Sequence, residues 1–502
     1  MPKMPSQPRT LLLAILALAL LIRLLGLVSR PIWYDEAFSI LFSEKGPAAM
    51  LQGTLPASGG SAAEEHPLGY YLILYAWEEV FGNFLPAVRI VSVLAGVTSV
   101  GLLYLTGREL FTERIGLAGA ILGALSPFQV HYSQEIRMYA LLGMWLLLTT
   151  YAFLRGARTQ SPKWWAVFAL GATLAQYTHT LASLYLIPLA LTPLFQRDWR
   201  TLRAVLVSGF CALLLYLPWL IHIPAQLSKV NSTYWILRPG MEKAFTLLLV
   251  YVTNLPLPDG WLFPGLAIAV FLFFIALWQS FRMFARREPG WKAGAWLMYL
   301  AFTPPLLSFL LSQWRPVYLE RSFLPSGALF CLWLAWAVFA TRLPRPVQIL
   351  TVCGLAIATM MGIGQHLSYT GFPYAPYREL QTSLQNQAQA GDAIIHSSKL
   401  SYLPAIYYDS ALNQTFIADP PGSDVDTLSS TTQDVLKVTS HPDIQTAARG
   451  VRQVWFIIFR QSLEEYASES GQIHPHLAWL EKNFHLVSIE DMGDLRLYHF
   501  SR

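Results

Sequence analysis

Two adjacent carboxylates, Asp35 and Glu36, directly follow the first membrane-length apolar run of the chain, 11–28. An ionised carboxylate at a membrane boundary is costly unless water, a cation or chemistry compensates it. A second polar cluster, which contains Glu135 and Arg137, also comes just after an apolar run. If both clusters face the same side of a membrane, they make an acid/base centre there. That combination favours an enzyme.

Each of these residues has a chemical role and a purely structural alternative. Asp35 or Glu36 can act as a general base on a hydroxyl or amine, and only one can enter a given cavity because adjacent helical side chains point about 100° apart. The alternative is an acid that caps the following helix. Glu135 can orient a substrate hydroxyl while Arg137 holds an anion. Alternatively, the two form a local ion pair of little energetic value.

Four further positions suit a phosphate or a substrate. Arg321 follows another apolar run, and its planar guanidinium can donate two parallel hydrogen bonds to phosphate; the alternative is snorkelling to lipid headgroups. His66 begins an apolar stretch, His179 lies in a tight turn, and Tyr139 closes the second polar cluster. A lone histidine at an interface is more often simply hydrogen bonded than bound to a ligand. The sequence has no glycine-rich phosphate loop and no His/Glu zinc spacing, so nothing supports a nucleotide or a metal.

The composition is that of a membrane protein. Of the 502 residues, 54% are hydrophobic and 13% are charged, whereas soluble domains carry roughly 25% charged residues. About 11 apolar runs have the length of a spanning helix, which predicts a polytopic α-helical membrane protein. These runs are 11–28, 87–105, 115–130, 140–154, 164–177, 181–195, 205–221, 261–281, 294–311, 323–340 and 347–364.

Charge in the connections predicts the topology. Basic residues fall in every second connection and at the N-terminus, as they do on the cytoplasmic side. The net charge of +5 is thereby explained without a nucleic-acid partner. We therefore expect a multi-pass protein of the plasma (inner) membrane with a cytoplasmic N-terminus, both acidic clusters outside, and an uncleaved first run. The outward loop 29–86 contains two apolar stretches, 38–51 and 68–81, predicted as surface helices.

After about residue 370 the chain changes character. Residues 1–370 are predicted to form the transmembrane domain and residues 371–502 a soluble α/β domain outside the membrane. Nothing in this second domain suggests catalysis, so we expect a cap or an acceptor-side module. Cys211, Cys331 and Cys353 all fall in predicted spans, which leaves no thiol for a disulfide in it. The predicted strands are 392–396, 415–418, 454–459, 486–489 and 495–500, with helices at 401–408, 463–468 and 476–484.

Six short motifs follow one another in a known order. They are WYDEA (33–37), HPLGYY (66–71), RIVS (89–92), SQEIRMYA (133–140), TH (178–179) and PVYLERSF (316–323). Together they resemble the membrane-embedded GT-C glycosyltransferases of the dolichyl-phosphate-mannose protein mannosyltransferase superfamily (glycosyltransferase family 39-like), whose bacterial members include the aminoarabinose transferases. The resemblance covers about residues 10–370 and is strongest over the first 180.

The resemblance implies a GT-C fold, an outward-facing active site and a polyprenyl-phosphate-linked sugar as donor and co-substrate, with inversion at the sugar and no metal cofactor. The acceptor is a glycan, a lipid or a protein. Position by position, Asp35 matches the family's base with Glu36 beside it, Glu135 its second acid, and Arg137, Arg321 and His66 its lipid-phosphate site. Leu68 and Ser322 depart from the family pattern, and these departures weaken the assignment of residues to the lipid-phosphate site.

Three other functions fit parts of the sequence. A transporter or flippase of lipid-linked intermediates would also carry intramembrane charges, but near the bilayer midplane and usually within internal repeats. An O-antigen ligase or polymerase would use diphosphate-linked donors at the same surface. A catalytically inactive scaffold would only present the C-terminal domain. Charges clustered at one surface, and the absence of a repeat, favour glycosyl transfer.

Overall fold

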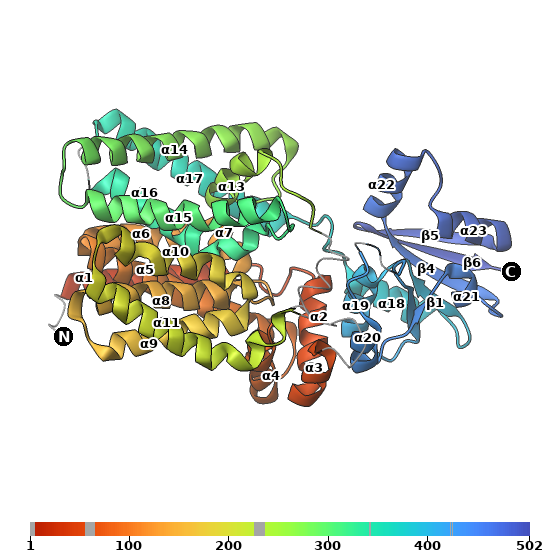
Figure 1. The fold of residues 1–502 in the computed structure, drawn as a ribbon. Coiled ribbons are helices and arrows are strands. Elements are labelled where there is room, and N and C mark those ends of the chain that lie inside the picture. Colours follow the sequence, from red (N-terminus) through yellow and green to blue (C-terminus); the bar gives the residue numbers. More distant parts are fainter. Residues whose placement is uncertain (1–5, 56–65, 225–235, 341–342, 422, 424) are drawn as a thin grey trace.

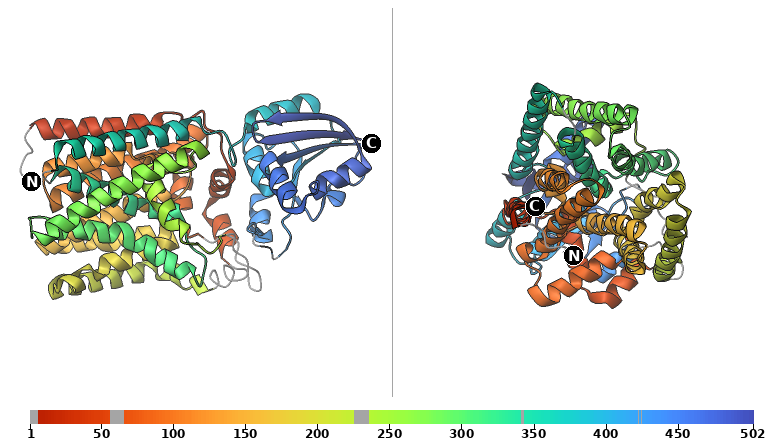
Figure 2. Two further views of the ribbon diagram at one scale, coloured as in Figure 1. Left: turned by 90° about the horizontal axis from the view of Figure 1, so that it is seen from above. Right: turned by 90° about the vertical axis from the view of Figure 1, so that its left-hand side faces the viewer.

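The chain folds into a bundle of helices followed by a domain built on a β-sheet (Figure 1). The computed structural model describes residues 6–55, 66–224, 236–340, 343–421, 423 and 425–502. The start of α1 lies at one end of the bundle, and the C-terminal domain lies beyond the opposite end (Figure 2). Helices α2, α3 and α4 lie between the bundle and that domain.

The described elements before the C-terminal domain are all helical. They are α1 (Ser6–Leu24), α2 (Tyr34–Ser43), α3 (Gly46–Thr54), α4 (Gly69–Phe81), α5 (Leu85–Leu110), α6 (Glu113–Leu125), α7 (Pro127–Tyr132), α8 (Tyr139–Thr159), α9 (Pro162–Thr178), η1 (Thr180–Ala182), α10 (Ser183–Gln196), α11 (Trp199–Leu220), α13 (Glu242–Val252), α14 (Asp259–Ala285), α15 (Trp291–Ser312), η2 (Glu320–Phe323), α16 (Leu324–Phe339) and α17 (Arg345–Ser368). The interior prolines of α10, α11, α14 and α15 are of the kind that membrane helices tolerate.

Within the described residues, seven helical stretches are long and apolar enough to cross a membrane, and one shorter apolar stretch, Thr180–Gln196, accompanies them. The seven are Leu85–Leu110, Tyr139–Thr159, Trp199–Leu220, Asp259–Ala285, Trp291–Ser312, Glu320–Phe339 and Arg345–Ser368. The predicted helical membrane architecture is confirmed, but the count of eleven spans is not. One physical reason is a break between α6 and α7, where Ser126 caps the N-terminus of α7 and Pro127 occupies its first turn.

The bundle packs around α16. All but one of the residues of α16 are buried, and α6, α8, α14 and α15 surround it. By contrast, α14 and α17 expose large apolar side chains such as Phe263, Phe281 and Ile349. Such side chains are stable in lipid and costly in water, so these helices form the lipid-facing side of a membrane-embedded protein.

The first predicted surface helix, 38–51, is two helices in the structure. α2 and α3 are separated at Gly46, whose φ of +80° lies in the left-handed region that favours glycine. The second, 68–81, is α4, and residues 56–65 of the same predicted loop lie outside the described residues. At the start of α4, a Cβ on Gly69 would lie 2.5 Å from the carbonyl oxygen of Tyr177. Only glycine fits there, so α4 packs tightly against the end of α9.

The C-terminal domain has a six-stranded sheet of order β3-β2-β1-β4-β6-β5. β1 to β4 are parallel, and β5 and β6 form an antiparallel hairpin against β4. The strands are β1 (Ala393–His396), β2 (Gln414–Ile417), β3 (Ser440–His441), β4 (Gln453–Phe459), β5 (His485–Met492) and β6 (Leu495–Ser501). The helices are α18 (Tyr377–Gln387), α19 (Lys399–Tyr408), α20 (Ser430–Leu436), α21 (Ile444–Ala447), α22 (Arg460–Ser470) and α23 (Pro475–Asn483).

All five strands and all three helices predicted for this domain are present, within one or two residues at most ends. The apolar run of β4 is buried on both faces, as expected for a strand inside a parallel sheet. Trp455 and Ile457 pack with α18, whereas Phe456 packs with α23. The sequence analysis missed α18, α20, α21 and β3. α18 is a polar helix with a single buried stripe, and β3 is two residues long.

The C-terminal domain packs directly on α2 and α3. One apolar cluster joins Phe42 and Met50 of these helices to Tyr402 of α19 and Leu436 of α20. The contact between α3 and α20 is close, since a Cβ on Gly53 would lie 3.5 Å from the Val435 side chain. The helix that carries Asp35 is therefore held between the two parts of the protein.

Candidate active site

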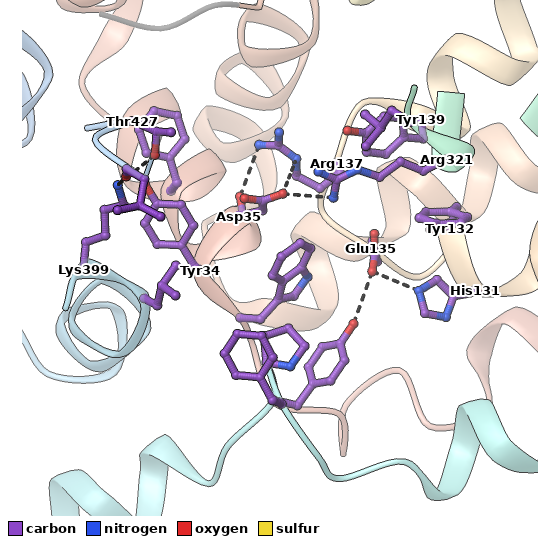
Figure 3. A pocket seen from close by; sticks show the side chains of 18 of the residues that line it. Tyr34, Asp35, His131, Tyr132, Glu135, Arg137, Tyr139, Arg321, Lys399 and Thr427 are labelled. Carbon is purple, nitrogen blue, oxygen red and sulfur yellow. Dashed lines mark hydrogen bonds and ion pairs between the residues drawn. The ribbon is translucent and has the colours of Figure 1, made fainter. Parts of the chain in front are cut away.

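A cavity of about 650 Å³ lies where the bundle meets the C-terminal domain (Figure 3). Its walls come from α2, the 131–139 segment, η2, the connection 369–374 and the C-terminal domain. Of the residues that the sequence predicts for the site, five line this cavity together with Tyr139: Asp35, His66, Glu135, Arg137 and Arg321. The other two, Glu36 and His179, lie behind its wall.

Asp35 lies in the first turn of α2 and points into the cavity. The residue before α2, Trp33, accepts no capping hydrogen bond through its side chain, and the Asp35 carboxylate is not used as a cap. Instead its Oδ2 accepts a hydrogen bond of 3.1 Å from Arg321 Nη1 and lies 3.6 Å from Arg137 Nε. The capping alternative is therefore wrong for this residue. The side chain is 18% exposed, enough to meet a ligand.

Glu36 points the opposite way and is buried. Its Oε2 lies 3.0 Å from Arg89 Nη2, and its Oε1 accepts the backbone N–H of Ile136 at 2.9 Å. The carboxylate therefore ties α2 to α5 and to the second polar cluster. Of the two adjacent acids, only Asp35 lines the cavity.

Arg89 makes several contacts that hold the segment 27–36 in place. Besides Glu36, its guanidinium donates to the carbonyl oxygens of Leu27 at 2.6 Å, Arg30 at 2.9 Å and Pro31 at 3.3 Å. One turn further along α5, Ser92 donates to the carbonyl oxygen of Glu135 at 2.6 Å. The RIVS motif thus fixes both polar clusters relative to each other without touching the cavity.

Glu135 does not pair with Arg137, so the structural alternative of a local ion pair is wrong. Its Oε1 accepts hydrogen bonds from His131 Nε2 at 3.1 Å and from the Tyr374 hydroxyl at 3.2 Å. Its Oε2 is buried and has no hydrogen-bond partner among the described residues. Burial alone would raise the pKa of Glu135, but the hydrogen bond from His131 and the charge of Arg30 lower this pKa. The ionised Glu135 side chain therefore lines the cavity through a carboxylate that accepts both of its hydrogen bonds at Oε1.

The two arginines converge on Asp35 from different parts of the chain. Arg137 comes from the second polar cluster and also donates to Ser39 Oγ at 3.2 Å. Arg321 comes from η2 and stacks over Tyr139, with its guanidinium carbon 4.9 Å from the ring centroid. Both side chains are largely buried and line the cavity, so Arg321 does not snorkel to headgroups. Both guanidinium groups line the cavity, where they can donate charge-assisted hydrogen bonds to an anion.

The two predicted histidines lie against each other, with ring centroids 4.8 Å apart. His66 lines the cavity, whereas His179 is buried behind it near Tyr139. His179 Nδ1 accepts the N–H of Leu181 at 3.1 Å. Burial, reinforced by Arg137 and Arg321, lowers the pKa of His179 to about 3. The pKa of His66 is lowered as well, first by burial. Neither ring carries a charge at neutral pH.

We expect the neutral His179 to make stability depend on pH. Its pKa is about 3 in the folded protein and near 6.5 in an unfolded chain, so below pH 6.5 the unfolded chain binds the proton more readily. The free energy of unfolding should therefore fall by about 2 kcal/mol between pH 7 and pH 5 from this residue alone. The apparent melting temperature in detergent checks this. His179→Gln should show a shallower pH dependence, and parallel curves for variant and wild type would refute the assignment.

Several cavity residues were missed by the sequence analysis. His131 and Tyr374 hold Glu135, and Lys399 and Asp419 of the C-terminal domain line the same cavity. Nothing in the local pattern marks Lys399 and Asp419, because the C-terminal domain reaches the site through the packing of α19 on α2. Within the described ranges, no group of three or more His, Cys, Asp or Glu side chains could hold a metal ion.

Sequence comparisons match part of the chain. The dolichyl-phosphate-mannose-protein mannosyltransferase family matches residues 65–222. The undecaprenyl phosphate-alpha-4-amino-4-deoxy-L-arabinose arabinosyl transferases of Pseudomonas paraeruginosa and Pseudomonas aeruginosa are each 30% identical over 179 residues, 34% of this chain. That segment spans 32% of each relative's length.

Solved structures match nearly the whole chain. The crystal structure of ArnT from Cupriavidus metallidurans bound to undecaprenyl phosphate has a TM-score of 0.62 at 11% identity, over 97% of this chain and 97% of that chain. The Archaeoglobus fulgidus oligosaccharyltransferase in complex with Zn and sulfate has a TM-score of 0.56 at 12% identity, over 96% of this chain and 73% of that chain. Such low identities establish the fold alone. Together with the matched family segment, they support a GT-C glycosyltransferase fold for the chain.

Proposed function

We propose that the protein transfers a sugar from a polyprenyl-phosphate donor to a hydroxyl or amine of an acceptor. The observation that carries the proposal is the placement of Asp35 between Arg137 and Arg321 in the cavity beside the bundle. The arginines offer charge for a phosphate, and the carboxylate offers a base within reach of the same ligand. The relatives named as undecaprenyl-phosphate arabinosyl transferases and the structure with bound undecaprenyl phosphate support this donor class.

The proposed reaction is a single displacement at the anomeric carbon. Asp35 takes the proton of the acceptor hydroxyl or amine as its oxygen or nitrogen forms a bond to that carbon. The bond from the carbon to the phosphate oxygen breaks, and the electron pair leaves with the phosphate. Arg137 and Arg321 stabilise that charge. Attack from the face opposite the phosphate inverts the configuration.

The remaining predicted residues have supporting roles in this proposal. The buried Oε2 of Glu135 accepts a hydrogen bond from a sugar or acceptor hydroxyl. His66 and Tyr139 line the phosphate side of the cavity. Glu36 positions α2 through Arg89 and is not itself a base. Because the arginines also contact Asp35, a bound phosphate would compete with this carboxylate for them. Donor binding would thus free Asp35 to accept a proton, so we expect the donor to bind before the acceptor.

The placement in the cell is part of the same proposal. We infer that the site faces the outer side of the plasma (inner) membrane, with the N-terminus cytoplasmic and the C-terminal domain outside. Residues 1–370 would form the transmembrane domain and residues 371–502 the extracytoplasmic one. The positions of the start of α1 and of the C-terminal domain at opposite ends of the bundle support this topology (Figure 2).

Arg321→Gln is expected to weaken the binding of undecaprenyl phosphate about 10- to 100-fold, since hydrogen bonds to charged groups contribute about 1.5–3 kcal/mol. Titration calorimetry in detergent measures the dissociation constant. Arg315→Gln is the matched control, because Arg315 is an exposed arginine of the same connection that does not line the cavity. Equal affinities of the two variants would remove Arg321 from the phosphate site.

The function is tested by supplying purified protein with a panel of polyprenyl-phosphate sugars and a membrane extract as acceptor. We expect one or more donors to be consumed with transfer of the sugar, and turnover to persist in EDTA. Consumption of diphosphate-linked donors only would favour a ligase or polymerase. Folded protein that binds undecaprenyl phosphate, consumes no donor and moves lipid between leaflets of a vesicle would establish a flippase instead.

A further inference from the structure

The wall of the cavity opposite the bundle comes from one edge of the C-terminal sheet. β1 ends at His396 and β2 ends at Ile417, and both strands run parallel. The residues that follow them, Ser398 and Lys399 after β1 and Asp419 after β2, line the cavity. The strand order reverses beside β1, which contacts β2 on one side and β4 on the other. Open α/β sheets bind ligands at the carboxyl ends of their strands.

Lys399 organises this wall and is itself fully engaged. Its ammonium donates to Asp419 Oδ2 at 2.6 Å, to the carbonyl oxygen of Val425 at 2.5 Å and to Thr427 Oγ1 at 2.8 Å. An ammonium has three protons, so these three acceptors occupy it. Its side chain is 5% exposed, while that of Asp419 is 16% exposed. The wall therefore presents oxygen atoms to a ligand, and the cation behind them is neutralised.

The chemistry of this wall differs from that of the phosphate side. Arg137 and Arg321 on the bundle side attract an anion, whereas Asp419 and Thr427 accept hydrogen bonds. Tyr34 from α2 lies between the two walls and adds an aromatic surface (Figure 3). A molecule rich in hydroxyl groups, with an apolar ring face, matches this combination. A lipid would meet carboxylate and hydroxyl oxygens here, and a peptide that adds a strand would need a sheet edge such as β3 or β5.

We propose that this wall, formed by Ser398, Asp419, Thr427 and Tyr34 and positioned by Lys399, is an acceptor subsite for a saccharide. The inference rests on the proposed function and extends it, because it assigns the class of acceptor. The saccharide lies between the C-terminal domain and Asp35, with one hydroxyl directed to that carboxylate. The donor phosphate occupies the arginine side of the same cavity.

The test compares three acceptors with a donor that the wild type consumes: an aryl glycoside, diacylglycerol and a serine-containing peptide. We expect transfer to the glycoside. Thr427→Val, which keeps the side-chain shape and removes the hydroxyl, should raise the KM for the glycoside about 5- to 10-fold through one lost hydrogen bond. The KM for the donor should stay within about twofold. Thr382→Val, an exposed threonine on α18, is the matched control.

The outcomes separate this inference from the function on which it rests. Transfer to the peptide or to diacylglycerol in preference to the glycoside contradicts the saccharide subsite but leaves glycosyl transfer standing. Donor hydrolysis without transfer to any of the three contradicts the subsite as well. An equal rise of the KM for donor and acceptor in Thr427→Val would show a general structural effect and would overturn the assignment. If no donor is consumed at all, both proposals fail.

Discussion

Asp35→Asn is expected to lower the rate of sugar transfer about 10²- to 10⁴-fold, the usual contribution of a general base. The amide keeps the size of the side chain but cannot accept the proton of the acceptor. Its carbonyl oxygen can still accept the hydrogen bond from Arg321, so the cavity should keep its shape. Single-turnover transfer with saturating donor measures the chemical step directly.

Measuring the donor affinity of Asp35→Asn distinguishes the loss of a catalytic base from general damage to the site. In Asp35→Asn the arginines no longer neutralise a carboxylate, so undecaprenyl phosphate should bind at least as tightly as it does to the wild type. Glu36→Gln cannot serve as the control, because that side chain is buried against Arg89. A variant that binds donor but transfers at the wild-type rate would move the base to Glu135, another carboxylate of the cavity.

Arg89→Met is expected to destabilise the protein by about 3–5 kcal/mol, the cost of removing one partner of a buried ion pair. Glu36 would remain buried without its cation, and the carbonyl oxygens of Leu27, Arg30 and Pro31 would lose their donor. The apparent melting temperature in detergent should fall accordingly. Activity should fall with it, because Asp35 follows this segment in the chain.

The double variant Arg89→Met/Glu36→Gln provides the control for that cost. Removal of both charges of a buried pair is often close to neutral, so the double variant should melt at a higher temperature than Arg89→Met alone. If the double variant is no more stable than the single one, the ion pair is not the source of the effect. The carbonyl contacts of Arg89 would then account for the loss.

Much of the site was predictable because its residues sit in short segments beside long apolar runs. Asp35, Glu135 and Arg321 each follow such a run, and a topology based on basic loops puts all three on one side. Sequence could not decide between Asp35 and Glu36, because adjacent acids differ only in direction. The decision came from Arg89, which lies 53 positions after Glu36 and holds it inside the protein.

The fold was predicted in outline for a similar reason. Apolar runs mark the helices of the bundle, and the strand of continuous apolar residues in β4 marks the C-terminal sheet. The count of eleven spans is not confirmed, because an apolar run does not show where a helix breaks, as it does at Ser126 and Pro127. The sequence did not predict that the C-terminal domain contributes residues to the cavity. This contribution depends on how α19 packs on α2, which no local pattern records.

The most direct test of the central claim is the anomeric configuration of the transferred sugar. Wild-type protein would be given one anomerically pure polyprenyl-phosphate sugar, and the product of a single turnover would be analysed by NMR. One base opposite a phosphate leaving group predicts complete inversion, with the free polyprenyl phosphate as the second product. Retention of configuration would require a covalent sugar–enzyme intermediate and would contradict the role of Asp35 as a base.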